Sequence, residues 1–224
     1  MRKRHSFLLT AFLMLLLAVP VHSAVDAVTA MQSRYAAMKS MRAEFIQTLT
    51  HKESGNREER RGVLSFAKPS HIRWETVSPI PELLLITPEA VWNIFPDEDM
   101  AYKYSAAMTA ESEGIIQVVT GQSKLDKDFA IATKSVANGM VTLTLYPNTP
   151  TPSMTEVELV VETETGLIKR VAIIDFYYNC NEIVFTSQAF DQVFDTSLFS
   201  YTPPEGTMVE DRTQRGPGGI PLMQ

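Results

Sequence analysis

Few side chains in this sequence have the types and spacing that covalent chemistry needs. Cys180 is the only cysteine, and it lies between Asn179 and Asn181 with no neighbouring cation to stabilise a thiolate. His51 or His71 could serve as a general base with a distant acid. His71 alternates onto the polar face of a predicted strand, however, so we expect solvent-facing histidines rather than a catalytic one. These residues predict a protein that is not an enzyme.

Sequence motifs for catalysis or cofactor binding are absent as well. The sequence has no G-x-S-x-G, H-E-x-x-H or C-x-x-C motif and no glycine-rich phosphate loop. Its grouped carboxylates, at 97–99 and at Glu162 and Glu164, coincide with turn signals and are typical of solvated loops. We therefore expect no metal site and no cofactor. An exported hydrolase stays open as an alternative that no motif supports.

The first 23 residues have the composition of a secretory signal peptide. Three cations at positions 2–4 precede an apolar run over residues 7–19, and Val21 and Ser23 supply the small residues that signal peptidase reads before Ala24. The run is about 13 residues long, whereas a membrane-spanning helix needs about 20. A cleaved signal peptide is therefore favoured over a retained anchor, and we expect the mature chain to be exported.

Charge and length narrow the class of protein further. The whole chain has a formal charge of −6, and removing residues 1–23 takes it to −9 because that segment carries three cations and no acid. An acidic domain is a poor candidate for binding nucleic acid, which needs a basic surface. We expect one domain over residues 24–211, followed by a tail over 212–224 that has too little apolar surface to fold.

The mature chain begins with a helical pattern and continues mostly as strands. Apolar residues recur at helical spacing over 25–39, and a second helix is predicted over 106–120. The predicted strands are residues 45–49, 62–66, 71–76, 83–87, 91–95, 100–104, 129–133, 140–146, 156–162, 167–176 and 182–190. About ten or eleven strands, with the helices on one side, predict an α+β fold built on one large curved antiparallel sheet.

Large apolar residues are dense in the first half of this predicted sheet. They are Phe45, Phe66, Trp74, Leu83, Leu85, Trp92 and Phe95. Their periodicity alone is compatible with an ordinary core. A curved sheet too large to be filled by its own side chains would instead leave an apolar pocket, and the helices would then act as its lid.

Several short motifs, taken in order, resemble the LolA family of periplasmic lipoprotein carriers. In the first half these are Phe45-x-Gln47, Gly62-x-Leu64-x-Phe66-x-Lys68-Pro69, Arg73-Trp74, Pro79 and Val91-Trp92. Near the end, the segment 199–206 followed by Val209 is similar to the family's C-terminal signature. The resemblance covers residues 25–211.

The resemblance implies an unclosed antiparallel β-barrel with a lid of about three helices over a hydrophobic cavity. The cargo would be the acyl chains of lipoproteins, received from an inner-membrane ABC-type complex and passed to an outer-membrane acceptor by a monomeric carrier. The cavity lining implied for this chain is Phe45, Leu64, Phe66, Ile72, Trp74, Leu83, Leu85, Trp92 and Ile94. The lid helix would contribute Ile115, Ile116 and Val119. A lipoprotein-sensing regulator of the same fold and a carrier of a glycolipid-type cargo remain alternatives.

The resemblance also implies a lid latch. In the family an arginine precedes the proline after the second strand and links the lid to the barrel, and Lys68 occupies that position here. Lysine keeps the positive charge and loses the forked donor geometry of arginine.

Overall fold

A single sheet of twelve strands dominates the computed structural model, which describes residues 22–108, 116–121 and 123–214. The strands are β1 Ser40–Thr50, β2 Arg57–Ala67, β3 His71–Ser78, β4 Glu82–Ile86, β5 Ala90–Phe95, β6 Met100–Ser105, β7 Phe129–Ala137, β8 Met140–Pro147, β9 Glu156–Glu162, β10 Ile168–Ile174, β11 Cys180–Phe190 and β12 Met208–Asp211. The helices are α1 His22–Ala37 and α3 Leu125–Asp128, with 3-10 turns η1 Pro96–Glu98, η2 Ala106–Met108 and η3 Thr196–Phe199.

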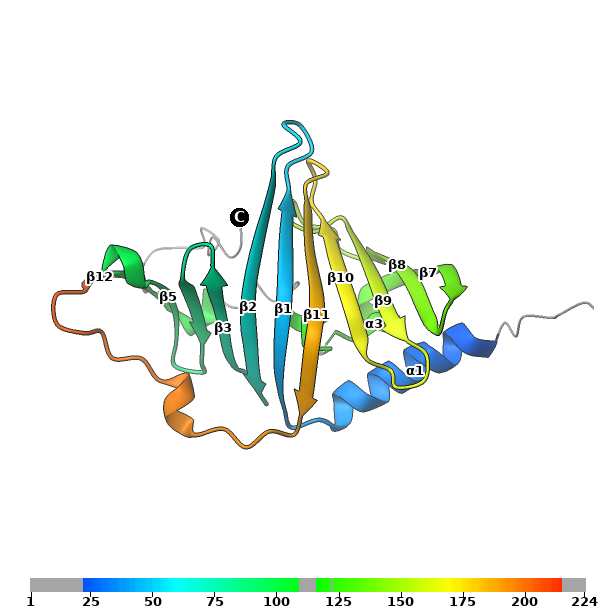
Figure 1. Cartoon of the computed structure of the whole chain (residues 1–224), viewed down its shortest axis with the longest axis horizontal. Coiled ribbons are helices and arrows are strands. Elements are labelled where there is room, and N and C mark those ends of the chain that lie inside the picture. Colours follow the sequence, from blue (N-terminus) through cyan, green and yellow to red (C-terminus); the bar gives the residue numbers. More distant parts are fainter. Residues whose placement is uncertain (1–21, 109–115, 122, 215–224) are drawn as a thin grey trace, which may run out of the picture.

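The strand order shows why the sheet stays open. It runs β12-β6-β5-β4-β3-β2-β1-β11-β10-β9-β8-β7, so β1 and β11 pair in the middle and β12 and β7 form the two edges (Figure 1). Neighbours are antiparallel except at one edge, where β12 pairs with β6 in parallel. The prediction of an unclosed antiparallel barrel is confirmed, with twelve strands in place of ten or eleven.

Bulges around Phe45 bend the centre of the sheet. The pairing of β1 with β11 shifts at Glu44/Phe45, and that of β2 with β3 shifts at Arg61/Gly62. Such bulges kink a strand and increase its twist. A Cβ atom at Gly62 would lie 2.4 Å from the Phe45 ring and 2.2 Å from the backbone oxygen of Glu75. Glycine is therefore required here, where the ring crosses the neighbouring strand.

The two faces of the sheet differ in chemistry. Side chains alternate between them, and one face, called the inner face here, carries Phe45, Leu64, Trp74, Leu143, Leu159 and Val171, all buried in one core cluster. On the opposite, outer face, Arg170 forms ion pairs with Glu158 and Glu182 across three neighbouring strands. The hydrophobic effect therefore places the core on the inner face, where the helices lie.

Helix α1 covers the inner face at the β7–β9 side of the sheet (Figure 1). It packs through Ala27, Met31 and Tyr35, which are at most 3% exposed. The Tyr35 hydroxyl accepts a hydrogen bond from the Ile168 backbone N–H at 3.2 Å, and burial raises the pKa of this phenol. The predicted helix over 25–39 is thus confirmed, beginning at His22 and ending at Ala37.

The segment predicted as a second helix is only partly described. Residues 106–108 form a 3-10 turn, residues 116–119 are helical, and residues 109–115 lie outside the described part of the chain. The predicted signal peptide falls almost wholly on residues 1–21, which are also not described. Among the residues that the structure describes, no helix has the length and hydropathy to cross a bilayer.

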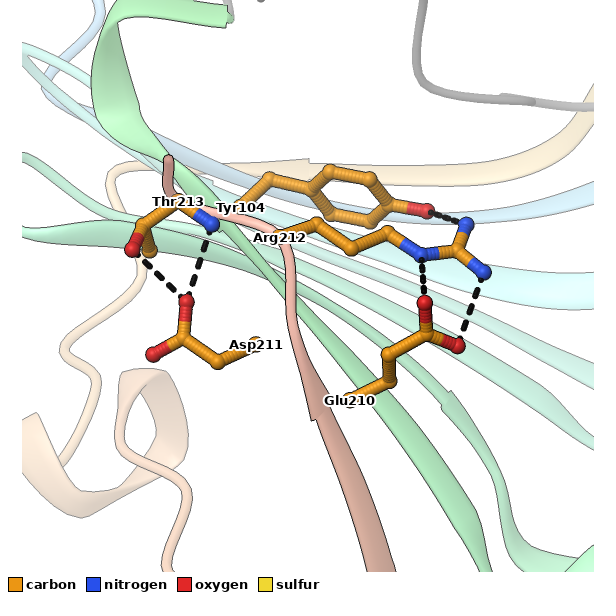
Figure 2. Close-up of polar contacts among 5 residues, drawn as sticks. All are labelled: Tyr104, Glu210, Asp211, Arg212 and Thr213. Carbon is orange, nitrogen blue, oxygen red and sulfur yellow. Dashed lines mark hydrogen bonds and ion pairs between the residues drawn. The ribbon is translucent and has the colours of Figure 1, made fainter. Parts of the chain in front are cut away.

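The C-terminal segment runs from β11 past the ends of the neighbouring strands to the β12 edge of the sheet (Figure 1), and on the way η3 contacts β3 and Tyr201 contacts Trp92 of β5. Arg212, just after β12, binds both carboxylate oxygens of Glu210 at 3.0 Å and donates to the Tyr104 hydroxyl at 3.0 Å (Figure 2). Its guanidinium also lies 4.0 Å from the centre of the Tyr102 ring. These contacts fasten Arg212 to the domain, although the sequence predicts that the disordered tail begins at this residue.

Candidate functional site

Five of the nine predicted lining residues share the inner face. Leu64 pairs with Trp74, and Phe66 pairs with Ile72, so the register of β2 and β3 places all four side chains on one side. Phe45 completes the group from β1, with its ring 4.5 Å from that of Trp74. All five are buried. These residues form a continuous apolar surface that could receive hydrocarbon if its cover moved.

The other four predicted lining residues lie on the outer face, which corrects the prediction of one shared cavity. Leu85 pairs with Arg73 and with Trp92, and Leu83 pairs with Glu75 and with Ile94. Because neighbouring strands keep paired side chains on the same side, these four cannot line the surface that Trp74 lines.

The physical reason for this error is a second layer over the outer face. The ring of Tyr201 lies 5.2 Å from that of Trp92, and Phe199 lies 5.5 Å from His71. The C-terminal segment thereby shields the outer face of β3–β5 from water. Because both faces of β4 are then covered, the run over residues 83–86 carries apolar side chains on both sides. The inner-face members missed by sequence reasoning are Leu84, Ile86, Val91 and Asn93. No signal in the sequence marks them, because only the register of the folded sheet, in which Trp74 pairs with Leu84, shows which side they face.

Part of the predicted lid helix packs over the same core. Ile116 and Val119 are buried and belong to the cluster that contains Phe45 and Trp74. Ile115 lies outside the described residues. Leu125, the buried residue of α3, joins the cluster from the far end of the same connection between β6 and β7. The described core cluster therefore includes side chains from both helical segments.

Lys68 connects α1 to the turn between β2 and β3. Its Nζ donates to the backbone oxygen of Tyr35 at 2.9 Å and to that of Ala36 at 2.7 Å. These carbonyls lie in the last turn of α1, which ends at Ala37, where they have no intrahelical partner and the helix dipole favours a cation. The position predicted for a latch is thus in contact with a helix of the cover.

Contacts on the other side of α1 fix the same end of the helix. Arg34 donates through Nε to the backbone oxygen of Thr165 at 2.5 Å. Gly166 has φ +69°, and a Cβ atom there would lie 2.6 Å from the Met31 nitrogen. Only glycine allows the β9–β10 turn and the helix to approach this closely.

A groove of about 420 Å³ opens beside this junction. It is lined by Ala30, Ser33, Arg34, Ala37, Met38, Thr165, Phe190 and Asp191. None of the nine predicted lining residues borders it. The five on the inner face, Phe45, Leu64, Phe66, Ile72 and Trp74, are each at most 4% exposed, so the described part of the chain covers them.

The residues considered for covalent chemistry stand apart from the inner face. Cys180 is half-buried at the start of β11, where burial, followed by the charge of Glu182, raises the pKa of its thiol and keeps it protonated. His71 packs on the outer face, and His51 is exposed in the β1–β2 turn. Within the described ranges, no three His, Cys, Asp or Glu side chains are grouped closely enough to hold a metal ion.

An open antiparallel sheet with helices over an apolar inner face is a fold also seen in a solved structure. An uncharacterized conserved protein from Thermus thermophilus superposes with a TM-score of 0.55 at 12% identity, over 85% of this chain and 99% of that one. This likeness concerns the fold alone.

Sequence comparison then identifies the family. The profile of the family described as "Outer membrane lipoprotein carrier protein LolA" matches residues 36–202. The chain is 22% identical over 171 residues to an outer-membrane lipoprotein carrier protein of Dechloromonas aromatica, covering 76% of this chain and 81% of that protein. It is 23% identical over 194 residues to the protein of the same description from Chromobacterium violaceum, covering 86% and 90%. This chain belongs to the LolA family.

Proposed function

We propose that this protein is a carrier of acylated lipoproteins, which shelters their acyl chains on the inner face of the sheet. The observation that carries the proposal is the continuous buried apolar surface of Phe45, Leu64, Phe66, Ile72 and Trp74, which shares one core cluster with Ile116 and Val119 of the helical segment 116–119. Membership of a family whose members are described as lipoprotein carriers supports it.

The energetics explain why such a cargo needs a carrier. Each CH₂ group removed from water contributes about 0.8 kcal/mol, so a long acyl chain is strongly disfavoured in free solution. The burial of these five side chains avoids exposing the same apolar surface when the carrier is empty. Binding then exchanges contacts between sheet and helices for contacts between sheet and cargo, which limits the net affinity and permits release.

The signal-peptide pattern supports a periplasmic site for this exchange. The carrier would receive lipoproteins from an inner-membrane ABC-type complex and deliver them to an outer-membrane acceptor, as a monomer. No covalent step is needed, which agrees with the raised pKa of the Cys180 thiol.

Native mass spectrometry of the protein purified from the periplasm of a Gram-negative host tests this proposal. We expect one-to-one complexes whose extra mass corresponds to a lipoprotein or its acylated fragment. Ile72→Ser, on the inner face of β3, should lose most of this mass. Val77→Ser on the same strand should keep it, because Val77 is 54% exposed. Preparations of folded wild type that carry only the polypeptide mass would contradict the proposal.

A further inference from the structure

One row of side chains crosses the inner face from β11 to the β12 edge. Successive cross-strand pairs define it: Gln188, Ala43, Leu64, Trp74, Leu84, Asn93, Tyr102 and Glu210. Because each residue pairs directly with the next, all of them lie at one level of the sheet. Most of the neighbouring levels on β2–β4 are apolar, with Phe66, Ile72 and Ile86 in the adjacent row.

Three members of this row carry buried polar atoms without a hydrogen-bond partner among the described residues. They are the indole Nε1 of Trp74, the amide Oδ1 of Asn93 and the amide Oε1 of Gln188. Trp74 is 3% exposed and Asn93 is 1% exposed. A buried polar group without a partner destabilises a fold, and an apolar residue of similar size would remove that cost.

The surroundings of Trp74 show that its N–H group is not needed for packing. Its ring contacts Phe45, and its cross-strand neighbours are Leu64 and Leu84, which need only an apolar surface. Asn93 lies two strands further on, about 10 Å away at the usual strand spacing. A donor and an amide are thus held at the same level of the sheet, next to apolar side chains of β2–β4.

We propose that this row is a subsite for the carbonyl-bearing linkage that joins an acyl chain to its head group, an ester or an amide. The Trp74 Nε1–H donates to a carbonyl oxygen of the cargo, and the Asn93 side chain, which can both donate and accept, holds a second polar atom of the linkage. The hydrocarbon part of the acyl chain lies on Phe66, Ile72 and the neighbouring apolar side chains. This inference rests on the proposed function and adds a chemical requirement, because the site would distinguish acylated cargo from bare hydrocarbon.

Matched short-chain phosphocholines test the subsite directly. One probe carries two ester-linked chains and the other carries two ether-linked chains of equal length, which lack the carbonyl groups. We expect the wild-type protein to bind the ester probe about fivefold more tightly, as for one net hydrogen bond. Trp74→Phe, which keeps an aromatic ring and removes the donor, should lower ester binding to the level of the ether probe. Trp92→Phe, on the outer face, should leave the preference intact.

The outcomes separate the subsite from the carrier function. Equal wild-type affinity for both probes would overturn the subsite and leave the carrier function standing, whereas binding of neither probe would count against both. Asn93→Leu adds a second readout: it should reduce the ester preference without lowering the midpoint of thermal unfolding of the empty protein. Earlier unfolding with an unchanged preference would show that Asn93 holds internal structure, for example through a buried water, and would remove it from the subsite.

Discussion

The contact between Lys68 and the end of α1 leads to a quantitative prediction about how the cover opens. Lys68→Met keeps an unbranched side chain of nearly the same length and removes both hydrogen bonds from Nζ to the carbonyls of Tyr35 and Ala36, at 2.9 and 2.7 Å. Charge-assisted hydrogen bonds contribute about 1.5–3 kcal/mol when buried, and a cation at a helix C-terminus about 0.3–1 kcal/mol. Lys68 is half-exposed, so solvent screening reduces these values to a total of about 1–2 kcal/mol.

This loss should act on α1 rather than on the whole sheet. A change of about 1–2 kcal/mol raises the population of the undocked helix by about five- to thirtyfold. Amide hydrogen exchange, followed by mass spectrometry, should therefore speed up by that factor in α1, while the amides of β1 change much less. Lys68→Arg should exchange at nearly the wild-type rate, because arginine keeps the charge and the donors.

Lys39→Met is the matched control for this experiment. Lys39 lies at the same junction, and its side chain is exposed, while its backbone N–H donates to Asp191 in either variant. Exchange in α1 that is equally fast in both variants would show that Lys68 does not hold the helix. Exchange that accelerates equally in α1 and β1 would show that Lys68 supports the whole domain.

Three further substitutions test other contacts of the cover and the sheet edge. Gly166→Ala should destabilise the protein by about 2 kcal/mol or more in denaturant unfolding. Gly55→Ala is the control, because Gly55 has the same φ of +69° but open space around it, and it should cost only about 1 kcal/mol. Equal costs for the two variants would refute the close approach of Gly166 to α1. Tyr35→Phe should cost about 1 kcal/mol at neutral pH. Burial raises the pKa of Tyr35 in the folded protein, so the stability contributed by its phenol is complete below about pH 10, the pKa of an unfolded tyrosine, and falls as the pH rises further. Wild type should therefore lose more stability above about pH 10 than Tyr35→Phe does. Arg212→Met should weaken the attachment of β12 and make the segment before β12 more sensitive to limited proteolysis. An unchanged cleavage pattern would show that the contacts of Arg212 with Glu210 and Tyr104 do not hold β12 in place.

The sequence was informative wherever one face of a strand meets water. The alternation over residues 71–76 predicted β3 correctly, and Gly55 marked the turn between β1 and β2. The run over residues 83–86 is apolar on both faces, so its periodicity could not say which side chains face inward. That depended on the C-terminal segment that covers Trp92, a contact between residues distant in sequence.

Other parts of the site depend on pairing that a single sequence does not reveal. The parallel pairing of β12 with β6 brings Arg212 to Tyr104, more than one hundred residues away. The polar row through Trp74 and Asn93 exists only once the register of the strands between them is known. The contact of Lys68 with α1, by contrast, lies where the family resemblance implied a latch.

The two tryptophans allow the most direct test of the central claim, since Trp74 lies on the inner face and Trp92 on the outer face. A diacylated lipopeptide with brominated acyl chains would be titrated into two single-tryptophan proteins, Trp92→Phe and Trp74→Phe. Bromine quenches indole fluorescence only at close contact, so the account predicts strong, saturable quenching of Trp74 and little quenching of Trp92. Quenching of Trp92 instead, or of neither tryptophan while the lipopeptide binds, would show that the acyl chains do not lie on the inner face.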